Sequence, residues 1–431
     1  MNYPFWEVPL VGGGWLIGIV AILHVFVSHF AVGGGLFLVL SEIKAYKTNN
    51  NVILNYVKKH SKFFLLLTIV FGALSGVAIW FTIGLVSPQA TSALIHIFVW
   101  GWAIEWVFFF VEIAAVMIYY YSWEKVDRRT HLAIGWIYFI AALLSMVIIN
   151  GILSFMLTPG KWIETKNFWD GFFNPTYFSS LVVRIVTAIV MAGIYGLFTA
   201  TFLVEKENRQ QIIKYSSKWV IPFMLILPIA SLWYYYTLPD IPKEIVLGGI
   251  SFVSNTAIIG IVAGFLIFLL VLIMGYFNTR LFNKFVATII LILGLTIMFA
   301  GERVRESIRK PYVIYDYMYS NGLLINQFDS IKEQGILKTS KWSKIKEITD
   351  ENKLQAGEVG FKLYCASCHI INGYNDVKPL ISDLDEETIA MIINDLENYR
   401  GYMPKFAGNE AEAEAIAKWL YQFNKENRKE Q

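Results

Sequence analysis

The chain has few cysteines and few charged residues for its length. Among its 431 residues only Cys365 and Cys368 are cysteines, so disulfide bonds do not account for the fold. Charged residues make up 16% of the chain, against about 25% in soluble domains. The net charge of +3 is too small to indicate a nucleic-acid partner. With 56% hydrophobic residues, this balance is typical of a polytopic membrane protein.

A signal peptide is also missing from the sequence pattern. Residues 1–4 (Met-Asn-Tyr-Pro) lack the positive charge that opens a signal peptide, and no small-residue cleavage site follows. We therefore expect the first apolar stretch to be a retained membrane span.

Long apolar runs fill the first 300 residues. A helix that crosses a hydrocarbon core of about 30 Å needs about 20 apolar residues. Eight stretches meet this need: 15–40, 63–86, 93–121, 132–157, 179–204, 218–237, 247–276 and 283–300. The sequence predicts an all-α fold, with a membrane bundle of about eight helices over 1–300, an extracytoplasmic connector over 301–351 and a small helical domain over 352–431.

Lysine and arginine gather in alternate loops between these stretches. The loops after the first, third, fifth and seventh stretches hold 14 of them, and the loops after the second, fourth and sixth hold 3. Loops rich in lysine and arginine stay on the cytoplasmic side of a membrane. We therefore predict a multi-pass inner-membrane protein with both termini outside the cytoplasm.

The most specific motif is Cys365-Ala366-Ser367-Cys368-His369. Two thiols at this spacing reach the two vinyl groups of one haem, and the adjacent histidine places its imidazole on the iron. The alternatives are a chance match and half of a zinc site, but zinc normally needs four protein ligands and no second Cys/His pair follows. The motif predicts one covalent haem c, held by Cys365 and Cys368 with His369 as an iron ligand.

The sequence around this motif resembles a class I cytochrome c over the whole domain. A predicted helix at 358–364 leads into the motif, Met403-Pro404 lies downstream, and an apolar helical face at 411–423 closes the domain. The resemblance implies that Met403 is the second axial ligand, a His/Met pairing that raises the reduction potential. The alternative for Met403 is a loop methionine in the core. This family attaches its haem outside the cytoplasm, in agreement with the charge count.

Ionisable side chains inside the hydrocarbon are costly and usually functional. The candidates are His24 and His29 in the first span, His96, Glu105 and Glu112 in the third, and Arg184 in the fifth. We interpret His60 and His131, which border basic loops, as ordinary interface residues.

For His24, and for the pair Glu105 and Glu112, the sequence leaves two roles open: a place in a haem site, or ordinary contacts between helices. His24 either ligates a b-type haem or bonds to a neighbouring helix; because it lies about 140° from His29 on the helix, we do not expect both on one iron. Glu105 and Glu112 either carry protons near a haem or are hydrogen-bonded acids kept neutral by burial. Glycines 33–35 allow the close approach of a macrocycle or of another helix.

The first five spans resemble subunit I of the cytochrome bd quinol oxidases. The matching runs are Leu23–Phe26 with Ala31–Gly34, Ile104-Glu105, Phe109–Glu112, Asn174-Pro175 and, after the eighth span, Arg309–Tyr312. The resemblance implies that His24 ligates a haem of the oxygen-reducing site. It also implies that Glu105 and Glu112 are that family's carboxylate pair, associated with the haem and with proton delivery.

The chain departs from that family where quinol is oxidised. The family's fifth-helix histidine, a b-haem ligand, has no counterpart, and Arg184 stands close to its place. Its methionine partner is also missing, the outer quinol-binding loop is reduced to 238–246, and the ninth span is replaced by the C-terminal domain. Quinol oxidation at the usual place is therefore not expected. We expect Arg184 to contact a haem propionate or a quinone oxygen, or to pair with a carboxylate. We expect Arg309 to contact a haem propionate or a quinone oxygen.

Together these features predict a respiratory haemoprotein that passes electrons between a membrane site, either b haem or quinol, and the c haem on the extracytoplasmic side. One alternative is a bd-like terminal reductase in which the c haem feeds an oxygen-reducing haem. Another is a cytochrome c domain on a membrane anchor without a redox site in the bundle. The chain is thus an oxidoreductase subunit, either of the quinol/cytochrome c type or like a terminal oxidase, or no enzyme at all.

The expected cofactors are one covalent haem c and at least one haem b, with a quinone left open. The expected partners are the lipid bilayer, soluble or membrane cytochromes, and a companion membrane subunit or larger respiratory complex, the last by analogy with the bd family.

Overall fold

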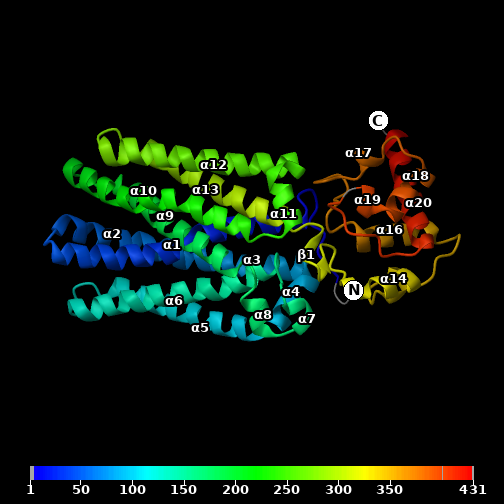
Figure 1. Cartoon of the computed structure of the whole chain (residues 1–431), viewed down its shortest axis with the longest axis horizontal. Coiled ribbons are helices and arrows are strands. Elements are labelled where there is room, and N and C mark those ends of the chain that lie inside the picture. Colours follow the sequence, from blue (N-terminus) through cyan, green and yellow to red (C-terminus); the bar gives the residue numbers. More distant parts are fainter. Residues whose placement is uncertain (1–3, 400, 430–431) are drawn as a thin grey trace. The chain divides into compact units, whose positions relative to one another are not determined.

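The computed structural model describes residues 4–399 and 401–429 (Figure 1). Within that part, eight helical stretches are long and apolar enough to cross a membrane, which confirms the predicted all-α membrane bundle. They are Gly13–Lys47, Asn51–Val86, Val99–Tyr121, Arg128–Phe155, Tyr177–Ala200, Lys206–Tyr236, Ser251–Phe277 and Lys284–Ser307.

These stretches consist of long helices, some of them joined by π-helical turns. The long helices are α1 (Gly13–Lys47), α2 (Asn51–Leu66), α3 (Ala73–Val86), α5 (Val99–Tyr121), α6 (Arg128–Phe155), α9 (Tyr177–Ala200), α10 (Lys206–Tyr236), α12 (Ser251–Leu270) and α13 (Lys284–Ser307). Shorter helices between them are α4 (Pro88–Ile97), α7 (Trp162–Thr165), α8 (Phe168–Phe172) and α11 (Asp240–Glu244). The π-helical turn Leu67–Gly72 joins α2 to α3, Ile245–Gly249 follows α11, and Val271–Phe277 follows α12.

The C-terminal part is made of short elements around two longer helices. In chain order they are strands β1 (Tyr312–Ile314) and β2 (Met318–Tyr319), α14 (Phe328–Gln334), α15 (Ile336–Thr339), α16 (Lys353–Tyr364), α17 (Lys378–Ile381), α18 (Glu386–Asn394), α19 (Leu396–Tyr399) and α20 (Glu410–Lys429). The two strands pair antiparallel, and the 3₁₀ turn Ile325–Gln327 leads into α14.

Several spans begin well before the apolar stretch that predicted them, because polar capping residues start them inside the basic loops. Asn50 accepts a hydrogen bond from the Ile53 amide at 3.1 Å and so starts α2. Asp127 caps α6 in the same way. A side-chain oxygen at this position satisfies an amide that the first helical turn leaves without a partner. Hydropathy detects only the apolar part of such a helix.

The third and eighth spans differ from their predicted bounds. Phe98 leaves the helical conformation, at φ −118° and ψ 34°, and divides the predicted span into α4 and α5. The assignment of His96 to the third span is therefore wrong: it lies on α4, where it is exposed. The eighth span continues as α13 to Ser307, so that Glu302 and Arg305 belong to the helix.

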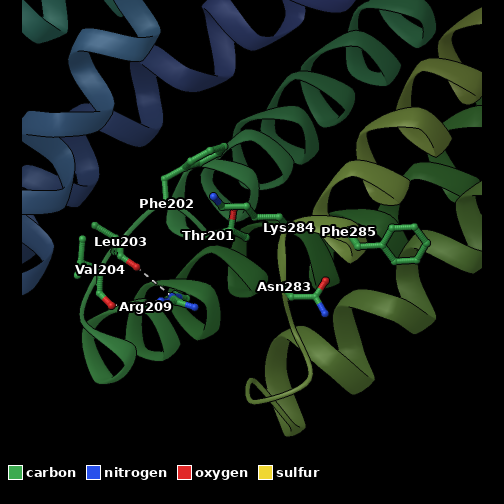
Figure 2. Close-up of a pocket in the computed structure, with 8 residues that line it drawn as sticks. All are labelled: Thr201, Phe202, Leu203, Val204, Arg209, Asn283, Lys284 and Phe285. Atoms are coloured by element: carbon green, nitrogen blue, oxygen red, sulfur yellow. Dashed lines mark hydrogen bonds between the residues drawn. The ribbon is translucent and has the colours of Figure 1, made fainter.

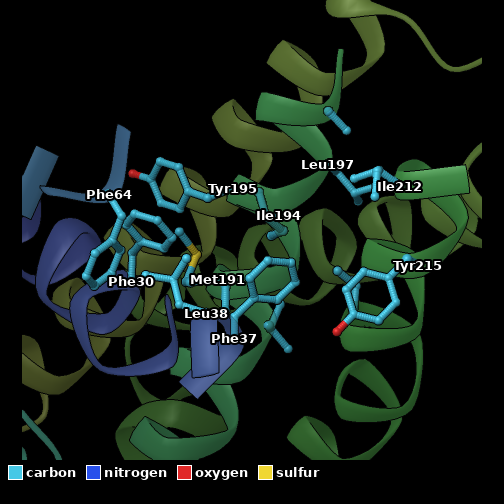
Figure 3. Close-up of a cluster of buried hydrophobic side chains, with 14 of the residues drawn as sticks. Phe30, Phe37, Leu38, Phe64, Met191, Ile194, Tyr195, Leu197, Ile212 and Tyr215 are labelled. Atoms are coloured by element: carbon cyan, nitrogen blue, oxygen red, sulfur yellow. The ribbon is translucent and has the colours of Figure 1, made fainter. Parts of the chain in front are cut away.

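The chain divides into two compact units. One comprises Met1–Ile19, Ile79–Ile97 and Arg309–Gln431, and the other comprises Val20–Ala78 and Phe98–Ile308. In the second unit, α5 packs on α6, α9 on α10 and α12 on α13, each helix against its neighbour in the chain. Figure 3 shows its core, in which Phe30 and Phe37 of α1 lie among side chains of α2, α9 and α10.

The contacts of Gly33 and Gly35 in α1 decide between the two roles left open for these glycines, the close approach of a macrocycle and that of another helix. A Cβ on Gly33 would lie 1.8 Å from the carbonyl oxygen of Ala188, and one on Gly35 would lie 2.5 Å from the Tyr138 ring. Both glycines therefore allow other helices to approach α1 closely. In this structure they serve helix packing.

The first unit contains a separate core around α16 and α20. A Cβ on Gly357 would lie 2.0 Å from the Ala415 carbonyl oxygen, so only glycine allows the two helices to cross at this point. Beside the crossing, the rings of Phe361 and Trp419 lie 5.0 Å apart. The predicted connector contributes to this core through Leu323, Ile331 and Ile336.

A buried carboxylate ties the connector to the C-terminal helix. Glu412 of α20 is only 2% exposed and accepts three hydrogen bonds. The donors are the amides of Ile336 (3.1 Å) and Leu337 (2.8 Å) and the hydroxyl of Tyr364 (3.1 Å). The first turn of α15 is therefore held to α16 and α20 through one side chain.

Replacing Glu412 by alanine will leave these three buried donors without an acceptor. Each such donor costs about 1–3 kcal/mol, so we expect the free energy of unfolding of this unit to fall by at least about 3 kcal/mol. Urea unfolding of the full chain in detergent, followed at the absorbance of the c haem, measures the loss. The matched control is Glu414→Ala: Glu414 is 51% exposed and forms an ion pair with Lys353 at 2.7 Å, a type of pair that contributes less than about 1 kcal/mol. Equal losses in the two variants would contradict this role for Glu412.

Candidate haem sites

The Cys365–His369 motif forms a single turn at the end of α16. The amides of Cys368 and His369 both donate to the carbonyl oxygen of Cys365, at 3.0 and 2.9 Å. The side chains of Cys365 and Cys368 are both half-buried. The turn thus brings the two thiols and the imidazole together, as attachment of one haem requires.

The imidazole of His369 has the tautomer that an iron ligand needs. Its Nδ1 lies 2.9 Å from the carbonyl oxygen of Asn375. A carbonyl oxygen can only accept, so Nδ1 carries the proton and Nε2 keeps its lone pair. Metal-binding histidines almost always donate their other ring N–H in this way. Asn375 is held in turn by a bond from its side-chain amide to the Cys368 carbonyl at 3.1 Å.

Burial favours the neutral forms of His369 and Cys365 in this turn. It lowers the pKa of His369, although the bond to Asn375 opposes that effect. It also raises the pKa of the Cys365 thiol to about 12. The pKa of the neighbouring Tyr364 is raised by burial and by the Glu412 carboxylate. A neutral imidazole is the form that binds a metal.

Met403 lies in the loop between α19 and α20 and is half-buried. Phe406, three residues later, packs on Tyr364 with the ring centroids 4.7 Å apart. This contact holds the loop against the helix that leads into the motif. The role of Met403 as second axial ligand stays a prediction.

A segment near the N-terminus contacts the loop that follows His369. The Tyr374 amide donates to the Leu10 carbonyl oxygen at 2.8 Å. The rings of Trp15 and Tyr374 meet edge to face at 5.6 Å. Gly12 adopts φ +82°, and a Cβ there would lie 3.1 Å from the Ile370 side chain, so the close approach needs glycine. We call residues 5–15 the N-terminal strap.

In the membrane bundle, His24 has the same tautomer as His369. Its Nδ1 lies 3.1 Å from the Ser75 hydroxyl. That hydroxyl donates its only proton to the Phe71 carbonyl oxygen, at 2.7 Å, so it accepts from His24 and leaves Nε2 with its lone pair. A Cβ on Gly76 would lie 3.2 Å from the His24 ring, which shows how closely the imidazole lies against α3.

His29 and Arg184 belong to a buried ionic cluster. The Nδ1 of His29 lies 2.8 Å from the Val25 carbonyl oxygen, and the ring is within electrostatic range of Arg184 and Glu302. Arg184 donates through Nε to Asn150 at 3.1 Å, and its guanidinium lies 3.9 Å from Glu302. Glu302 makes its close ion pair, of 2.8 Å, with Arg305 instead.

The sequence analysis named Arg184 but missed Glu302 and Arg305, because it ended the eighth span at residue 300. The signal was present, since charged residues one helical turn apart follow the apolar run without a break. Arg309, the second residue after α13, is 4% exposed. Its contact with a propionate or a quinone stays a prediction.

The carboxylates Glu105 and Glu112 lie one heptad apart on α5 and are linked through α6. Ser145 donates to Glu105 at 3.2 Å and also lies beside Glu112. The structure therefore brings the two predicted carboxylates to one serine hydroxyl.

The interpretation of His60 and His131 as ordinary interface residues is wrong. Both side chains are buried, at 1% and 3% exposure. His60 lies among aromatic rings, with Nδ1 2.9 Å from the Thr199 hydroxyl. His131 faces Glu42 at 2.9 Å, a buried carboxylate that the sequence analysis did not single out. The missed signal is that Glu42 follows His24 by five full helical turns and so shares its face of α1.

The pocket in Figure 2 is a separate surface feature. It is lined by the turn 201–204 with Arg209, and by 283–285 at the start of α13. On one side of it, Arg209 donates to the Leu203 carbonyl oxygen at 3.0 Å. It contains none of the predicted site residues.

Comparison with known proteins gives two family matches. The model of cytochrome bd terminal oxidase subunit I matches residues 14–234, and that of cytochrome c oxidase, cbb3-type, subunit III matches residues 352–420. No curated protein matches the chain. Among solved structures, the bd oxidase from Geobacillus thermodenitrificans is similar in fold, with a TM-score of 0.63 at 14% identity over 70% of this chain and 87% of that one.

The matches confirm the two resemblances and the broad function. A bd-oxidase-like membrane domain and a cytochrome c domain on one chain make it a respiratory electron-transfer haemoprotein, multi-pass in the membrane, and imply haem of the b and c types. Since the first match covers more than half of the residues, the chain belongs to the cytochrome bd terminal oxidase subunit I family.

Proposed function

We propose that this protein passes electrons between a b-type haem in the membrane bundle and a covalent c-type haem on the C-terminal domain. The observation that carries the proposal is the Cys365–His369 turn, in which two thiols and an imidazole with an available Nε2 lie together. In the bundle, His24 donates its Nδ1–H to Ser75, so its Nε2 also keeps its lone pair. A bound haem supplies one-electron redox chemistry at its iron. These two histidines would hold the irons, with Cys365 and Cys368 as thioether donors and Met403 as the second c-haem ligand.

The proposed division of the chain is a membrane domain over 1–300, a connector over 301–351 and a cytochrome c domain over 352–431. Both termini lie outside the cytoplasm in this proposal, as the distribution of lysine and arginine favours. The N-terminal strap supports placing the termini on the same side, because Leu10 bonds directly to Tyr374 in one compact unit.

The charged residues of the bundle take subsidiary roles. Glu105 and Glu112, joined through Ser145, carry protons. Arg184 contacts a haem propionate or a quinone oxygen, as does Arg309. The 3.9 Å separation of Arg184 from Glu302 exceeds hydrogen-bond length, so its terminal N–H groups can turn to another anion.

The partners in this proposal are soluble or membrane cytochromes, which exchange electrons with the c haem, and a companion membrane subunit. The companion rests on analogy with the family.

A terminal reductase is the second candidate, in which the c haem feeds an oxygen-reducing haem. The observation that favours it is the linked pair Glu105 and Glu112, since oxygen reduction consumes protons.

A pyridine haemochrome assay on the purified full chain tests the proposal. Electron transfer requires one c haem and at least one b haem per chain; a preparation with c haem alone would leave only a membrane anchor. Carbon monoxide then separates the two candidates. A reduced membrane haem that stays six-coordinate and binds no carbon monoxide supports electron transfer alone, and one that binds it supports the reductase.

A further inference from the structure

Glu42 and His131 form a buried, hydrogen-bonded pair. The Nδ1 of His131 lies 2.9 and 3.0 Å from the two carboxylate oxygens of Glu42, and Nε2 lies 3.0 Å from the carbonyl oxygen of Tyr119. Because that carbonyl only accepts, Nε2 carries a proton. The imidazolium–carboxylate and imidazole–carboxylic acid forms of the pair then differ only in the position of one proton between Nδ1 and Glu42.

Stability alone does not account for this pair. The Glu42 side chain is fully buried and that of His131 is 4% exposed. Replacing such a pair by packed apolar side chains is often neutral or stabilising, and ionisable residues in membrane spans are usually functional. Tyr119 donates to Glu42 at 2.7 Å, and the Tyr46 hydroxyl also bonds to it, with the Arg128 guanidinium 4.4 Å from the Tyr46 ring.

A basic pocket lies next to the pair. It is lined by Asn55, Lys58, Lys59, Lys62, Tyr120, Tyr121, Trp123 and Lys125. The Trp123 ring packs on His131, with centroids 4.1 Å apart, and its indole N–H donates to Ser61 at 3.1 Å. One tryptophan ring thus contacts both the pocket and the buried imidazole, which brings solvent close to the pair.

From this pair, polar groups continue along two helices at heptad spacing. On α5 they are Tyr119, Glu112 and Glu105, and on α6 they are His131, Tyr138 and Ser145. Seven residues return to the same helix face within about 20°, so each helix presents one stripe. We call these six residues together with Glu42 the polar stripe.

The contacts across the polar stripe join the two helices at each level. At the level of the buried pair, the rings of Tyr119 and His131 lie 4.3 Å apart. At the next, Tyr138 is within electrostatic range of Glu112, and its hydroxyl donates to the Ala31 carbonyl oxygen of α1 at 3.1 Å. At the far level, Ser145 donates to Glu105.

We propose that Glu42, Tyr119 and His131 form a proton-loading site, from which a proton passes along the polar stripe to Glu112 and Glu105. This rests on the proposed function, in which His24 holds a haem in the same bundle. An electron added to a buried iron makes its surroundings more negative and favours protonation of nearby carboxylates. A haem held by His24 would accept one electron from an external reductant, and the added charge would be balanced by one proton from bulk solvent, which replaces the proton that His131 passes inwards.

The test uses the full chain in detergent, reduced rapidly with ascorbate and a redox mediator in weakly buffered solution containing a pH-indicator dye. Removing a proton relay slows transfer on the order of 100-fold or more. Glu42→Gln and His131→Gln should each slow proton uptake by about that factor, with b and c haem contents unchanged. His60→Gln is the matched control, because His60 is equally buried but faces Thr199 and lies off the polar stripe; it should keep the rate of the unaltered protein.

A second readout does not depend on haem. When the resting protein is moved into heavy water, the infrared C=O band of its buried carboxylic acids shifts as their protons exchange, and the part lost in Glu112→Gln identifies Glu112. That shift should be slowed in Glu42→Gln and unchanged in His60→Gln.

Unaltered rates of uptake and exchange in both Glu42→Gln and His131→Gln would overturn the proposal and make the pair purely structural. If haem-free preparations still showed the exchange effect, the proposed function would be contradicted, whereas the proton-loading site would be supported.

Discussion

Replacing both Cys365 and Cys368 by serine will abolish covalent haem attachment to the C-terminal domain. Both thiols lie in one turn with His369, and no other cysteine exists in the chain to replace them. A serine hydroxyl does not form the thioether bonds to the haem vinyl groups. Haem-dependent peroxidase staining on a denaturing gel should fall from full intensity to background.

Met403→Leu is the matched control for this loss. It leaves both thiols and His369 in place, so the stain should remain at full intensity. Removing the thioether ligand should instead lower the reduction potential of the c haem, since His/Met ligation raises it. A stained band in the double serine variant would contradict the assignment of the motif.

Replacing His24 by alanine will remove a haem from the membrane bundle. His24 is the proposed ligand, and Ser75 holds its Nδ1 at 3.1 Å. The b-to-c ratio in a pyridine haemochrome assay should fall by one b haem per c haem. Ser75→Ala tests the same site more gently, because loss of a hydrogen bond that orients a metal-binding histidine weakens binding about 10–100-fold.

His96→Ala serves as the matched control for His24→Ala. His96 is exposed on α4, and its Nδ1 lies 2.7 Å from a backbone carbonyl of its own helix. This variant should keep the b-to-c ratio of the unaltered protein. A His24→Ala protein with its full complement of b haem would show that the ligand lies elsewhere.

The helical bundle could be predicted from apolar runs, but the ends of its helices could not. Capping by Asn50 and Asp127 depends on a single side chain, which an average over about 20 residues does not register. The break at Phe98 is a local backbone change inside an apolar run. These helix ends determine that His96 lies on α4 and that Glu302 and Arg305 lie on α13.

The candidate sites also divide into a part that the sequence predicts and a part that it does not. The c-haem motif is local, with two thiols and an imidazole within five residues, and its spacing carries the chemistry. The ionic partners of His131 and Arg184 come from other helices. Glu42 lies 89 residues from His131 along the chain, and such pairings become visible only when the helices are packed. Spacing along one helix identifies a shared face, but not the residues opposite it.

The N-terminal strap has a consequence for how the protein is made. Leu10 leaves the ribosome long before its partner Tyr374, because most of the membrane bundle lies between them in the sequence. Loop-closure entropy opposes contacts between such distant residues until the intervening structure has formed. The N-terminal strap therefore cannot complete its contacts until the domain that contains Tyr374 has been synthesised and folded. Folding of the Cys365–His369 turn and docking of the N-terminal strap are therefore expected to occur together, late in folding.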